Sequence, residues 1–351
     1  MTRERLDEIL SGFARARIAV VGDFFLDDYL EVEPALAEVS LETGLEARQV
    51  VAVRRQPGGA GNVAANLCAL GVERVECVGV IGDDGEGFEL GRALRSVGAR
   101  TEHLIARPEL FTPTYRKPIV RLAEGEVREL ERLDTKNRRP MRDEVEQELI
   151  ARLCSLAPQL AGIVVQDQVQ EAECGVVTTR VREALAELVA DRPSLKSLVD
   201  SRTRVGLFRG LALKCNEQEA CGAIGGAEAV QCAAGLSRRA GAPVFLTMGA
   251  QGIAVVTGDE VQRVPTAQVE GPLDIVGAGD SAGAGILAAL SAGASLGEAA
   301  IIGNIVASVT VQQIGTTGSA TQQQARARLR EFEGVWRELP PVERMEPSAQ
   351  A

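Results

Sequence analysis

The stretch DIVGAGDSAGAG, from Asp274 to Gly285, places two carboxylates six positions apart and fills the gap mainly with small residues. Glycine has no Cβ, so the backbone N–H groups of Gly277, Ala278 and Gly279 stay uncovered and can turn toward one point. The residues that follow are rich in Ala and Leu, which favours a helix. Unpaired amides and the helix dipole at such an N-terminus attract an anion. The stretch therefore predicts an anion-binding loop that leads into a helix.

Asp280 lies at the end of this loop, where its carboxylate would repel the anion that the loop binds. A carboxylate in this unfavourable position is explained if it takes a proton from a nucleophile that attacks the anion. Asp is also a preferred N-cap residue, and that role needs no ligand. The segment alone leaves both interpretations open.

Composition limits the class of protein and of partner. A chain of 351 residues with 45% hydrophobic and 25% charged residues is typical of a globular protein with a large core. The net charge of −11 argues against nucleic acid or an anionic membrane as a partner, because both are bound through basic surfaces. The first residues carry charges where a signal peptide has its apolar run, and no segment has the apolar length of a membrane span, so we expect a cytoplasmic protein. The seven cysteines form no CxxC pair and His103 is the only histidine, so metal-site spacing is absent from the sequence.

Short apolar runs alternate with helical patterns along most of the chain. Runs typical of buried strands are RIAVVGD (17–23), VECVGVIG (75–82), AGIVVQD (161–167) and PVFLTMG (243–249). This alternation predicts an α/β protein with a mostly parallel central sheet.

Two segments break this rhythm, at about residues 29–56 and 111–134, and both look like extended, partly exposed strands. We expect them to form a small β lid that projects from the main body, for use as an active-site cover or as a dimer interface. No repeat or long linker divides the chain, so we predict a single domain over residues 1–340. Residues 341–351 are Pro-containing and are expected to form a loose tail.

Several polar or Gly-rich turns follow predicted strands, where ligands gather in open α/β sheets. In GDFFLDD, Asp23 and Asp27 offer carboxylates that suit sugar hydroxyls, although an Asp after a strand is often only a cap. In PGGAGNVAANL, Gly58 and Gly59 permit close approach to a ligand and Asn62 offers a donor and an acceptor. A Gly-rich turn with an Asn cap is the alternative.

Two further turns have the same double interpretation. In LKCNEQEA, Asn216 and Glu219 lie three positions apart, which suits either water-mediated Mg²⁺ binding or a capping box. In LTMGAQGIAVV, Gly249 and Gly252 fit a hairpin turn, and Thr247 with Gly249 could also face a nucleotide.

Taken in order, the motifs GDxxxD, GGxxNVA, NxxE, TxG and DxVGAGD resemble those of the ribokinase-like carbohydrate kinases, also called the phosphofructokinase B family, over about residues 16–325. RIAVVGDFFLDDYL and PGGAGNVAANLCALG are most similar to the D-glycero-β-D-manno-heptose 7-phosphate kinase domain. The resemblance implies a three-layer α/β/α fold with a small β lid, and ATP-dependent phosphorylation of a sugar or sugar phosphate, here D-glycero-D-manno-heptose 7-phosphate to the 1,7-bisphosphate.

The resemblance also assigns roles to matching residues of this chain. Asp280 would be the general base, and the amides of Gly277, Ala278 and Gly279 would stabilise the transferring group. The substrate residues would be Asp23, Asp27, Gly58, Gly59, Asn62 and Asp167. If the substrate already carries a phosphate, Arg116, Lys117 and Arg121 of the second lid segment are candidates to bind it, and solvated lid charges are the alternative. The nucleotide residues would be Asn216, Glu219, Thr247, Gly249, Gly252 and Asn304. Glu219 would hold Mg²⁺ through water, and Asp274 could coordinate K⁺.

Two segments depart from the heptose kinase pattern: SLETGLEA at Ser40–Ala47 and VDSR at Val199–Arg202. They leave open a kinase of the same family for another small hydroxylated substrate, such as fructose, ribose or a nucleoside. A catalytically silent sugar or nucleotide sensor on the same fold is a third interpretation, which retention of Asp280 argues against. We expect a homodimer that forms through the lid.

Overall fold

The structure is a computed structural model, and it describes residues 1–122, 127–315 and 317–345. Within these residues, a central ten-stranded sheet has the order β15-β14-β13-β12-β11-β10-β9-β1-β4-β5. Its parallel strands are β1 (Arg17–Gly22), β4 (Arg74–Gly82), β5 (Arg100–Arg107), β9 (Gly162–Asp167), β10 (Lys196–Ser201), β11 (Leu213–Asn216) and β12 (Val244–Thr247). Three antiparallel strands extend one edge: β13 (Ile253–Thr257), β14 (Glu260–Val264) and β15 (Glu343–Arg344).

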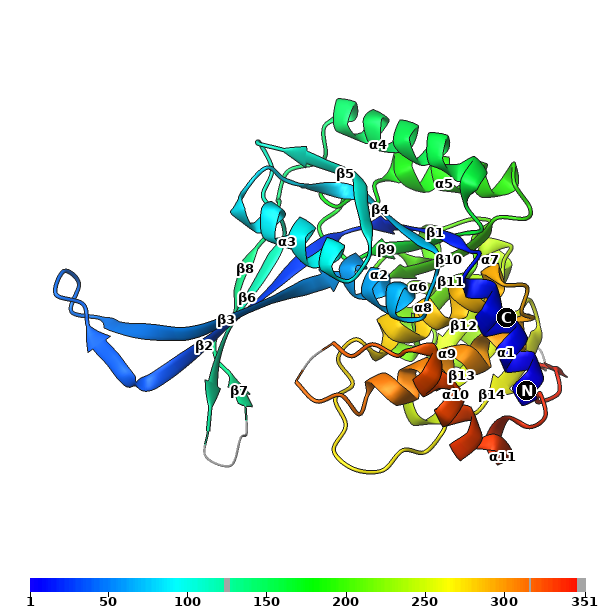
Figure 1. Ribbon diagram of the computed structural model, residues 1–351. Helices are drawn as coiled ribbons and strands as arrows, with labels where there is room; N and C mark the ends of the chain where they lie inside the picture. The colour runs from blue at the N-terminus through cyan, green and yellow to red at the C-terminus, as the bar shows by residue number, and fades with distance from the viewer. Residues whose placement is uncertain (123–126, 316, 346–351) are drawn as a thin grey trace.

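Helices cover both faces of this sheet, which gives the expected three layers (Figure 1). One face packs against α1 (Arg3–Phe13), α2 (Ala60–Ala69), α3 (Gly85–Ser96), α8 (Ala278–Ser291), α9 (Leu296–Thr310) and α10 (Gln322–Glu331), with α11 (Glu333–Trp336) beside them. The other face packs against α4 (Asp143–Leu156), α5 (Thr179–Ala190), α6 (Glu217–Ile224) and α7 (Ala229–Ala240). The α/β fold with a mostly parallel sheet is therefore confirmed.

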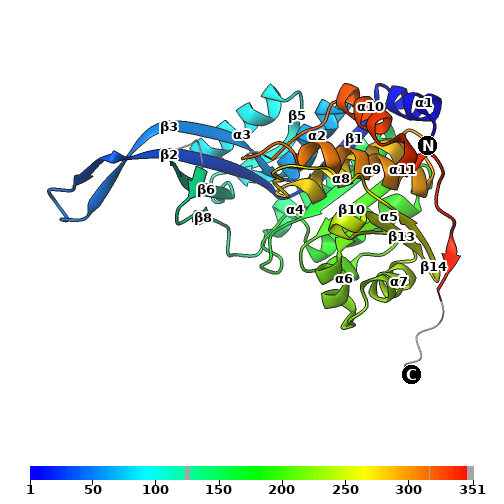
Figure 2. The same ribbon diagram turned by 90° about the horizontal axis from the view of Figure 1, so that it is seen from below.

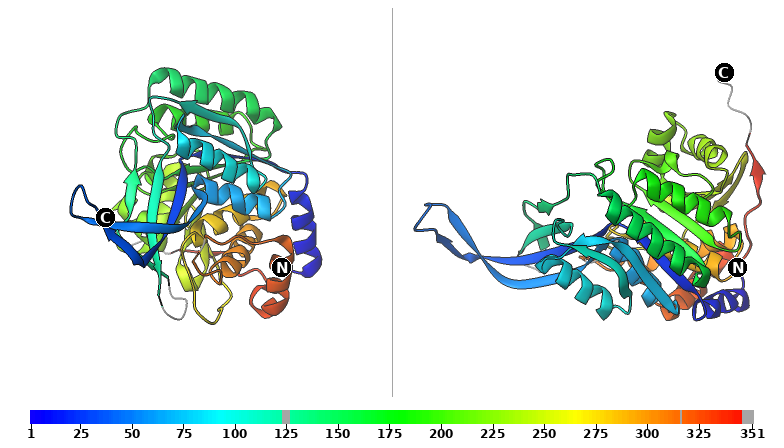
Figure 3. Two further views of the ribbon diagram at one scale, coloured as in Figure 1. Left: turned by 60° about the vertical axis from the view of Figure 1, so that its left-hand side comes forward. Right: turned by 90° about the horizontal axis from the view of Figure 1, so that it is seen from above.

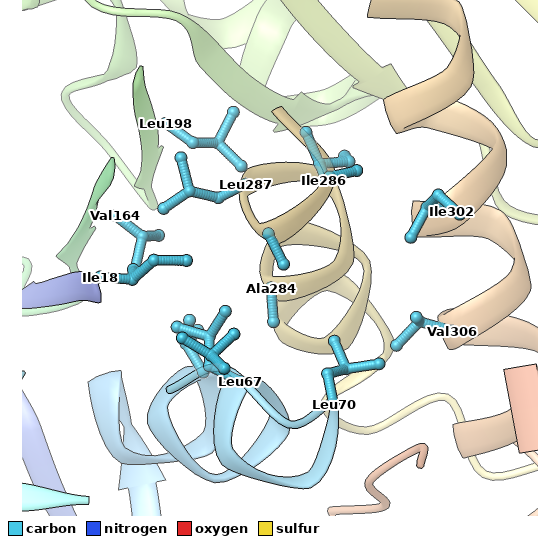
Figure 4. Close-up of a cluster of buried hydrophobic side chains, with 14 of the residues drawn as sticks. Ile18, Leu67, Leu70, Val164, Leu198, Ala284, Ile286, Leu287, Ile302 and Val306 are labelled. Atoms are coloured by element: carbon cyan, nitrogen blue, oxygen red, sulfur yellow. The ribbon is translucent and has the colours of Figure 1, made fainter. Parts of the chain in front are cut away.

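The helix that follows the anion loop lies at the centre of the core. In Figure 4, Leu287 of α8 points toward Val164 and Leu198 of the sheet, and α9 packs on the far side of α8 through Ile302 and Val306. Its small residues permit this double packing: a Cβ on Gly285 would lie 3.0 Å from Val306. Because α8 is buried on several sides, its N-terminus is held rigidly at the edge of the sheet.

A second sheet projects from the main body, and its long hairpin extends well beyond the helices (Figures 1 and 2). It has the strand order β3-β2-β6-β7, with β8 paired to β6. Its strands are β2 (Phe24–Val39), β3 (Glu46–Gly59), β6 (Thr114–Arg121), β7 (Val127–Glu129) and β8 (Leu133–Thr135). These strands coincide with the two segments expected to form the lid, except that residues 123–126 of the second segment lie outside the described residues.

The tail differs from its expectation. Residues 343–344 form β15, which pairs with β14, and Arg263 Nη1 lies 3.1 Å from the Glu343 carboxylate. The prediction of a loose tail from residue 341 was wrong for these residues, because an exposed sheet edge offers backbone partners that a sequence pattern does not reveal. Residues 346–351 lie outside the described residues. Figure 3 shows β15 as the red strand at the edge of the sheet.

Candidate active site

The order in which the chain adds strands to the sheet changes direction between the neighbouring strands β1 and β9. From β1 the chain continues to β4 and β5 on one side, and later from β9 to β12 on the other. Crevices for ligands form at such switch points, beyond the carboxyl ends of the strands. A cavity of about 680 Å³ lies there, lined by Gln168, Asp200, Arg202, Lys214, Asn216, Glu219, Gly277, Gly279 and Asp280, among others.

The anion loop forms the N-terminus of α8 as expected. Gly277 is the N-cap and has left-handed backbone angles, with φ of 79°. Asp274 orders the approach to this loop, because its carboxylate accepts hydrogen bonds from the backbone N–H of Val276 at 3.0 Å and of Gly315 at 2.9 Å. No side chain caps the helix, and Gly277 and Gly279 line the cavity, whereas the Ala278 N–H donates to the Ile275 carbonyl at 3.1 Å. Asp280 lies inside the helix and is not its N-cap, which removes the purely structural interpretation of that residue.

Two sequence motifs that lie 218 positions apart meet at Asp280. Asn62 Nδ2, from the first turn of α2, donates to Asp280 Oδ2 at 3.1 Å. Desolvation of the carboxyl and the nearby Asp200 carboxylate raise the pKa of Asp280 to about 6, although Lys214, Asn62 and Arg202 act in the opposite direction. A carboxyl with this pKa is ionised at neutral pH and is a stronger base than an exposed Asp.

A buried ion pair lies beneath the anion loop, and sequence reasoning missed it. Lys214 Nζ is 2.5 Å from Asp200 Oδ2, and both side chains are buried. Burial alone would lower the pKa of Lys214, but the Asp200 carboxylate raises it above its usual value. A Cβ on Gly279 would lie only 2.9 Å from Lys214 Nζ, so this glycine lets the ammonium group approach the helix. The signal for both residues was present, since each lies near the carboxyl end of a parallel strand.

Residues 16–323 match the family model described as pfkB family carbohydrate kinase. The chain belongs to the pfkB family of carbohydrate kinases. Among its curated relatives, the bifunctional protein HldE of Citrifermentans bemidjiense is 32% identical over 329 residues, covering 90% of this chain and 64% of that protein. The HldE protein of Trichlorobacter lovleyi is 30% identical over 326 residues, with coverages of 90% and 64%. The kinase chain thus spans about two thirds of the length of these relatives.

Solved structures with the same fold include the ribokinase of Arabidopsis thaliana in complex with ribose and ATP. It aligns with a TM-score of 0.64 at 17% identity, over 90% of this kinase and 99% of that chain. Phosphofructokinase-2 of Escherichia coli in complex with potassium aligns with a TM-score of 0.67 at 17% identity, over 91% and 99% of the two chains. These neighbours confirm the ribokinase-like fold.

The lid of the kinase has two different faces, set by the period-two alternation of its strands. In the pairing register Asp27 lies opposite Gln56 and Tyr115, and Tyr29 lies opposite Arg54 and Lys117, so these six side chains share one face. Lys117 Nζ lies 3.1 Å from Asp27 Oδ1, and Arg54 stacks 3.9 Å from the centroid of the Tyr29 ring. We call these six residues the inner lid face.

The inner lid face is directed toward the anion loop. Gln56 Nε2 donates to Thr317 Oγ1 at 3.1 Å, and Thr317 lies beside Gly277, where an added Cβ would be 3.3 Å from it. Asp27 is only 4% exposed, and its Oδ1 has no aligned hydrogen bond within the described part of the chain. Burial raises the pKa of Asp27, while Lys117, Arg132 and Arg54 oppose the shift. Its free acceptor capacity is what a sugar hydroxyl requires.

Arg116 points to the other face of the lid. Its Nε lies 3.0 Å from Asp28 Oδ2 and its Nη2 lies 3.0 Å from Glu86 Oε1. Its neighbours in sequence, Tyr115 and Lys117, alternate to the inner lid face. The structure therefore does not bring the predicted substrate residue Arg116 to the cavity, because a shift of one position along a strand changes the face.

Two other predicted substrate residues are held by protein groups. The Asp23 carboxylate accepts hydrogen bonds from the backbone N–H of Gln168, Val169 and Val176 at 2.7–2.9 Å. Desolvation nevertheless raises the pKa of Asp23 to about 6. Asp167 is buried, forms an ion pair with Arg204 and accepts a hydrogen bond from Ser201 Oγ at 2.6 Å. Neither lies in the lining of the Asp280 cavity, so the geometry gives them structural contacts.

Gly58 and Gly59 form the junction between β3 and α2, below Asp27. A Cβ on Gly58 would lie 3.0 Å from the Asp27 carboxyl group. Gly59 has φ of 54°, and a Cβ there would lie 2.6 Å from the Asp23 carbonyl oxygen and the Phe25 ring. Both residues thus let the lid strand and α2 meet closely around the predicted sugar position.

The predicted nucleotide residues divide into two groups. Asn216 and Glu219 line the cavity and also form a capping box of α6, in which each side chain bonds the other residue's backbone N–H. Burial raises the pKa of Glu219. Thr247 donates to the Cys215 carbonyl, and Asn304 Nδ2 donates to the carbonyls of Val264 and Pro265 at 3.0 and 3.1 Å. Thr247, Gly249, Gly252 and Asn304 lie outside the cavity lining.

The acidic side chains of the cavity limit which metal ion it can hold. The described residues contain no group of three or more His, Cys, Asp or Glu side chains placed to hold a metal ion. Glu219 Oε2 accepts from the Asn216 N–H, so the other carboxylate oxygen remains available at the cavity. One carboxylate beside a phosphate suits Mg²⁺, which keeps most of its waters.

None of the described helices is long and apolar enough to cross a membrane.

Proposed function

We propose that this kinase transfers the γ-phosphoryl group of ATP to a hydroxyl group of a sugar phosphate, most closely D-glycero-D-manno-heptose 7-phosphate, to form the 1,7-bisphosphate. The observation that carries the proposal is the placement of Asp280, bonded to Asn62, at the mouth of an anion loop that opens on a large cavity. Similarity of the opening and Gly-rich segments to heptose 7-phosphate kinases supports the choice of sugar.

In this mechanism Asp280 accepts the proton of the acceptor hydroxyl. The hydroxyl oxygen then bonds to the γ-phosphorus, the bond from that phosphorus to the bridging oxygen of ATP breaks, and ADP leaves with the electron pair. The amides of Gly277, Ala278 and Gly279 stabilise charge on the transferring group. Asp27 and Asn62 bind hydroxyl groups of the sugar beside it.

Mg²⁺ would neutralise charge on the phosphates when bound, and Glu219 with Asn216 would hold its waters. Asp274 remains our candidate for a K⁺ ligand, although both of its oxygens already accept backbone N–H groups. Thr247, Gly249, Gly252 and Asn304 would shape the protein behind the nucleotide. A cytoplasmic setting and a homodimer formed through the lid stay predictions.

Charge on the inner lid face favours an acceptor that already carries a phosphate. Arg54 and Lys117 of this face, together with Arg132 outside it, lie near Asp27 and oppose the rise of the Asp27 pKa that burial causes. Arg132 is paired with Asp134 at 2.6 Å, whereas Arg54 has no carboxylate within ion-pair distance among the described residues. The Arg54 terminal nitrogens donate to neutral oxygens, Gln56 Oε1 at 2.7 Å and the Gly315 carbonyl at 3.1 Å, so the charge of Arg54 is not paired and favours a nearby phosphate group.

Turnover tests the proposal. ADP release is measured with Mg²⁺-ATP and K⁺ for heptose 7-phosphate, fructose, fructose 6-phosphate, ribose and adenosine. We expect the highest kcat/KM with heptose 7-phosphate, and loss of turnover in Asp280→Asn. Asp259→Asn, at an exposed turn, is the matched control that should keep activity. Preference for another acceptor would overturn the choice of sugar, and absence of ATP binding would overturn the kinase mechanism.

A further inference from the structure

Arg202 lines the cavity together with Asp280, and no role was assigned to it from the sequence. It follows β10 directly, and its backbone N–H donates to the Asp167 carbonyl at 3.1 Å. Its side chain is exposed to the cavity and lies close enough to lower the pKa values of Asp280 and Glu219. It therefore shares the cavity with the candidate base and the candidate magnesium residue.

Only two cationic side chains line this cavity among the described residues, Lys214 and Arg202. The charge of Lys214 is compensated by Asp200, whose carboxylate is 2.5 Å away. Arg202 has no carboxylate within ion-pair distance in the described part of the chain. Arg202 thus offers an anionic ligand a positive charge that is not held in an ion pair within the described residues, although the Asp280 and Glu219 carboxylates line the same cavity.

A neutral side chain holds this charge in place. Arg202 Nε donates to Gln168 Oε1 at 2.8 Å, and Gln168 Nε2 in turn donates to Gln166 Oε1 at 3.0 Å. The Gln168 backbone is fixed by its hydrogen bond to the buried Asp23 carboxylate. This contact orients the guanidinium group through Nε without neutralising it, and it leaves both terminal nitrogens without a hydrogen bond within the described ranges.

We propose that Arg202 binds the phosphoryl group in transfer, with its terminal nitrogens on the γ-phosphate oxygens of ATP, and that Gln168 is its positioning residue. The inference rests on the proposed phosphotransfer. Guanidinium groups donate two parallel hydrogen bonds to a phosphate, and charge on the equatorial oxygens is the main quantity that a phosphotransferase must stabilise. The same chemistry would suit the acceptor's own phosphate, so the test separates the two sources.

The test compares Arg202→Gln and Arg202→Lys with the wild type and with Arg330→Gln, an exposed control in α10 without a partner among the described residues. Calorimetry measures binding of Mg²⁺-ADP with and without aluminium fluoride, which mimics the phosphoryl group in transfer. We expect Arg202→Gln to bind Mg²⁺-ADP as the wild type does and to lose about 10²- to 10³-fold in affinity for the aluminium fluoride complex, with a similar loss in kcat. Arg202→Lys should retain part of the affinity for the aluminium fluoride complex and part of kcat.

Gln168→Glu is the second variant, because it replaces the neutral contact by a carboxylate of the same size. We expect a lower kcat with little change in either KM and an unchanged melting temperature. Unaltered affinity for the aluminium fluoride complex in Arg202→Gln would overturn the inference, as would a defect confined to KM for a phosphorylated acceptor. The calorimetric experiment needs no acceptor, so it decides the role of Arg202 even if every sugar on the panel fails and the proposed function falls.

Discussion

The Asp280 carboxyl is surrounded by groups from three other elements and from the loop that follows one of them. Asp200 on β10 raises its pKa, whereas Lys214 on β11, Asn62 on α2 and Arg202 after β10 lower it. Desolvation is the largest influence, and the net result is a pKa of about 6. The base is thus ionised at neutral pH but is protonated under mildly acid conditions.

We therefore predict that kcat/KM falls as the pH drops through about 6, because a protonated Asp280 cannot accept the hydroxyl proton. Asn62→Ala removes a hydrogen bond to the ionised carboxylate, so the pKa of Asp280 should rise and the acid limb should move to higher pH. A pH–rate profile measures both effects. Asn137→Ala, outside the Asp280 cavity, serves as the control, and an acid limb that stays in place in Asn62→Ala would contradict this account.

At the scale of elements, the junction between the lid strand β3 and helix α2 is the most constrained point of the site. Gly59 has a positive φ, and a Cβ added to it would lie 2.6 Å from the Asp23 carbonyl oxygen and the Phe25 ring. The junction also determines where α2 begins, and so where Asn62 lies in its first turn and where Gly58 passes Asp27. A change here should alter the fold and the acceptor site together.

We predict that Gly59→Ala lowers the free energy of unfolding by about 1–3 kcal/mol, because the new Cβ meets backbone atoms and a positive φ strains an L-residue. KM for the acceptor should rise as well, since Asp27 and Asn62 lose their relative placement. Gly85→Ala is the control, at a helical position where an added Cβ meets no atom within 4 Å. Denaturant unfolding and steady-state kinetics measure the two effects, and equal stability of the two variants would refute the argument.

At the scale of the whole molecule, the lid hairpin extends beyond the body and has an open edge. β3 is the outer strand of its sheet, so its outward backbone groups are available for pairing. Large apolar side chains are exposed toward its tip, with Val39 and Leu45 both 69% exposed. Because both strand pairing and apolar burial are self-complementary, a second copy of the chain is the occupant that we propose for this edge.

We predict a dimer in sedimentation equilibrium at micromolar concentration. The double variant Val39→Lys with Leu45→Lys should shift the population to monomer, because two charges would have to be buried at the contact. Val342→Lys, at an exposed apolar position away from the lid, should leave the dimer intact. A monomeric wild type, or a double variant that remains dimeric, would exclude an interface at the hairpin tip.

Local pattern predicted much of the site because its chemistry is concentrated in short motifs. The Gly-rich loop and Asp280 were identified from one stretch, and Asn62 from another, and the structure brings them into contact. The extended, partly exposed character of residues 29–56 and 111–134 also predicted the lid. Arg116 was assigned to the substrate because the sequence does not show which face of a lid strand meets the main body.

What the sequence alone determined was the α/β class, the lid segments and the loop that begins α8, since each depends on local periodicity and on the conformational freedom of small residues. Only the tertiary structure decided which charges share the cavity. Gln168, Lys214, and Asp200 with Arg202 come from the ends of three strands, β9, β11 and β10, and their pairing depends on the order of those strands in the sheet. Asp200 forms an ion pair with Lys214, whereas Arg202 has no ion-pair partner among the described residues. Both facts depend on distances across the sheet, and no local sequence pattern encodes them.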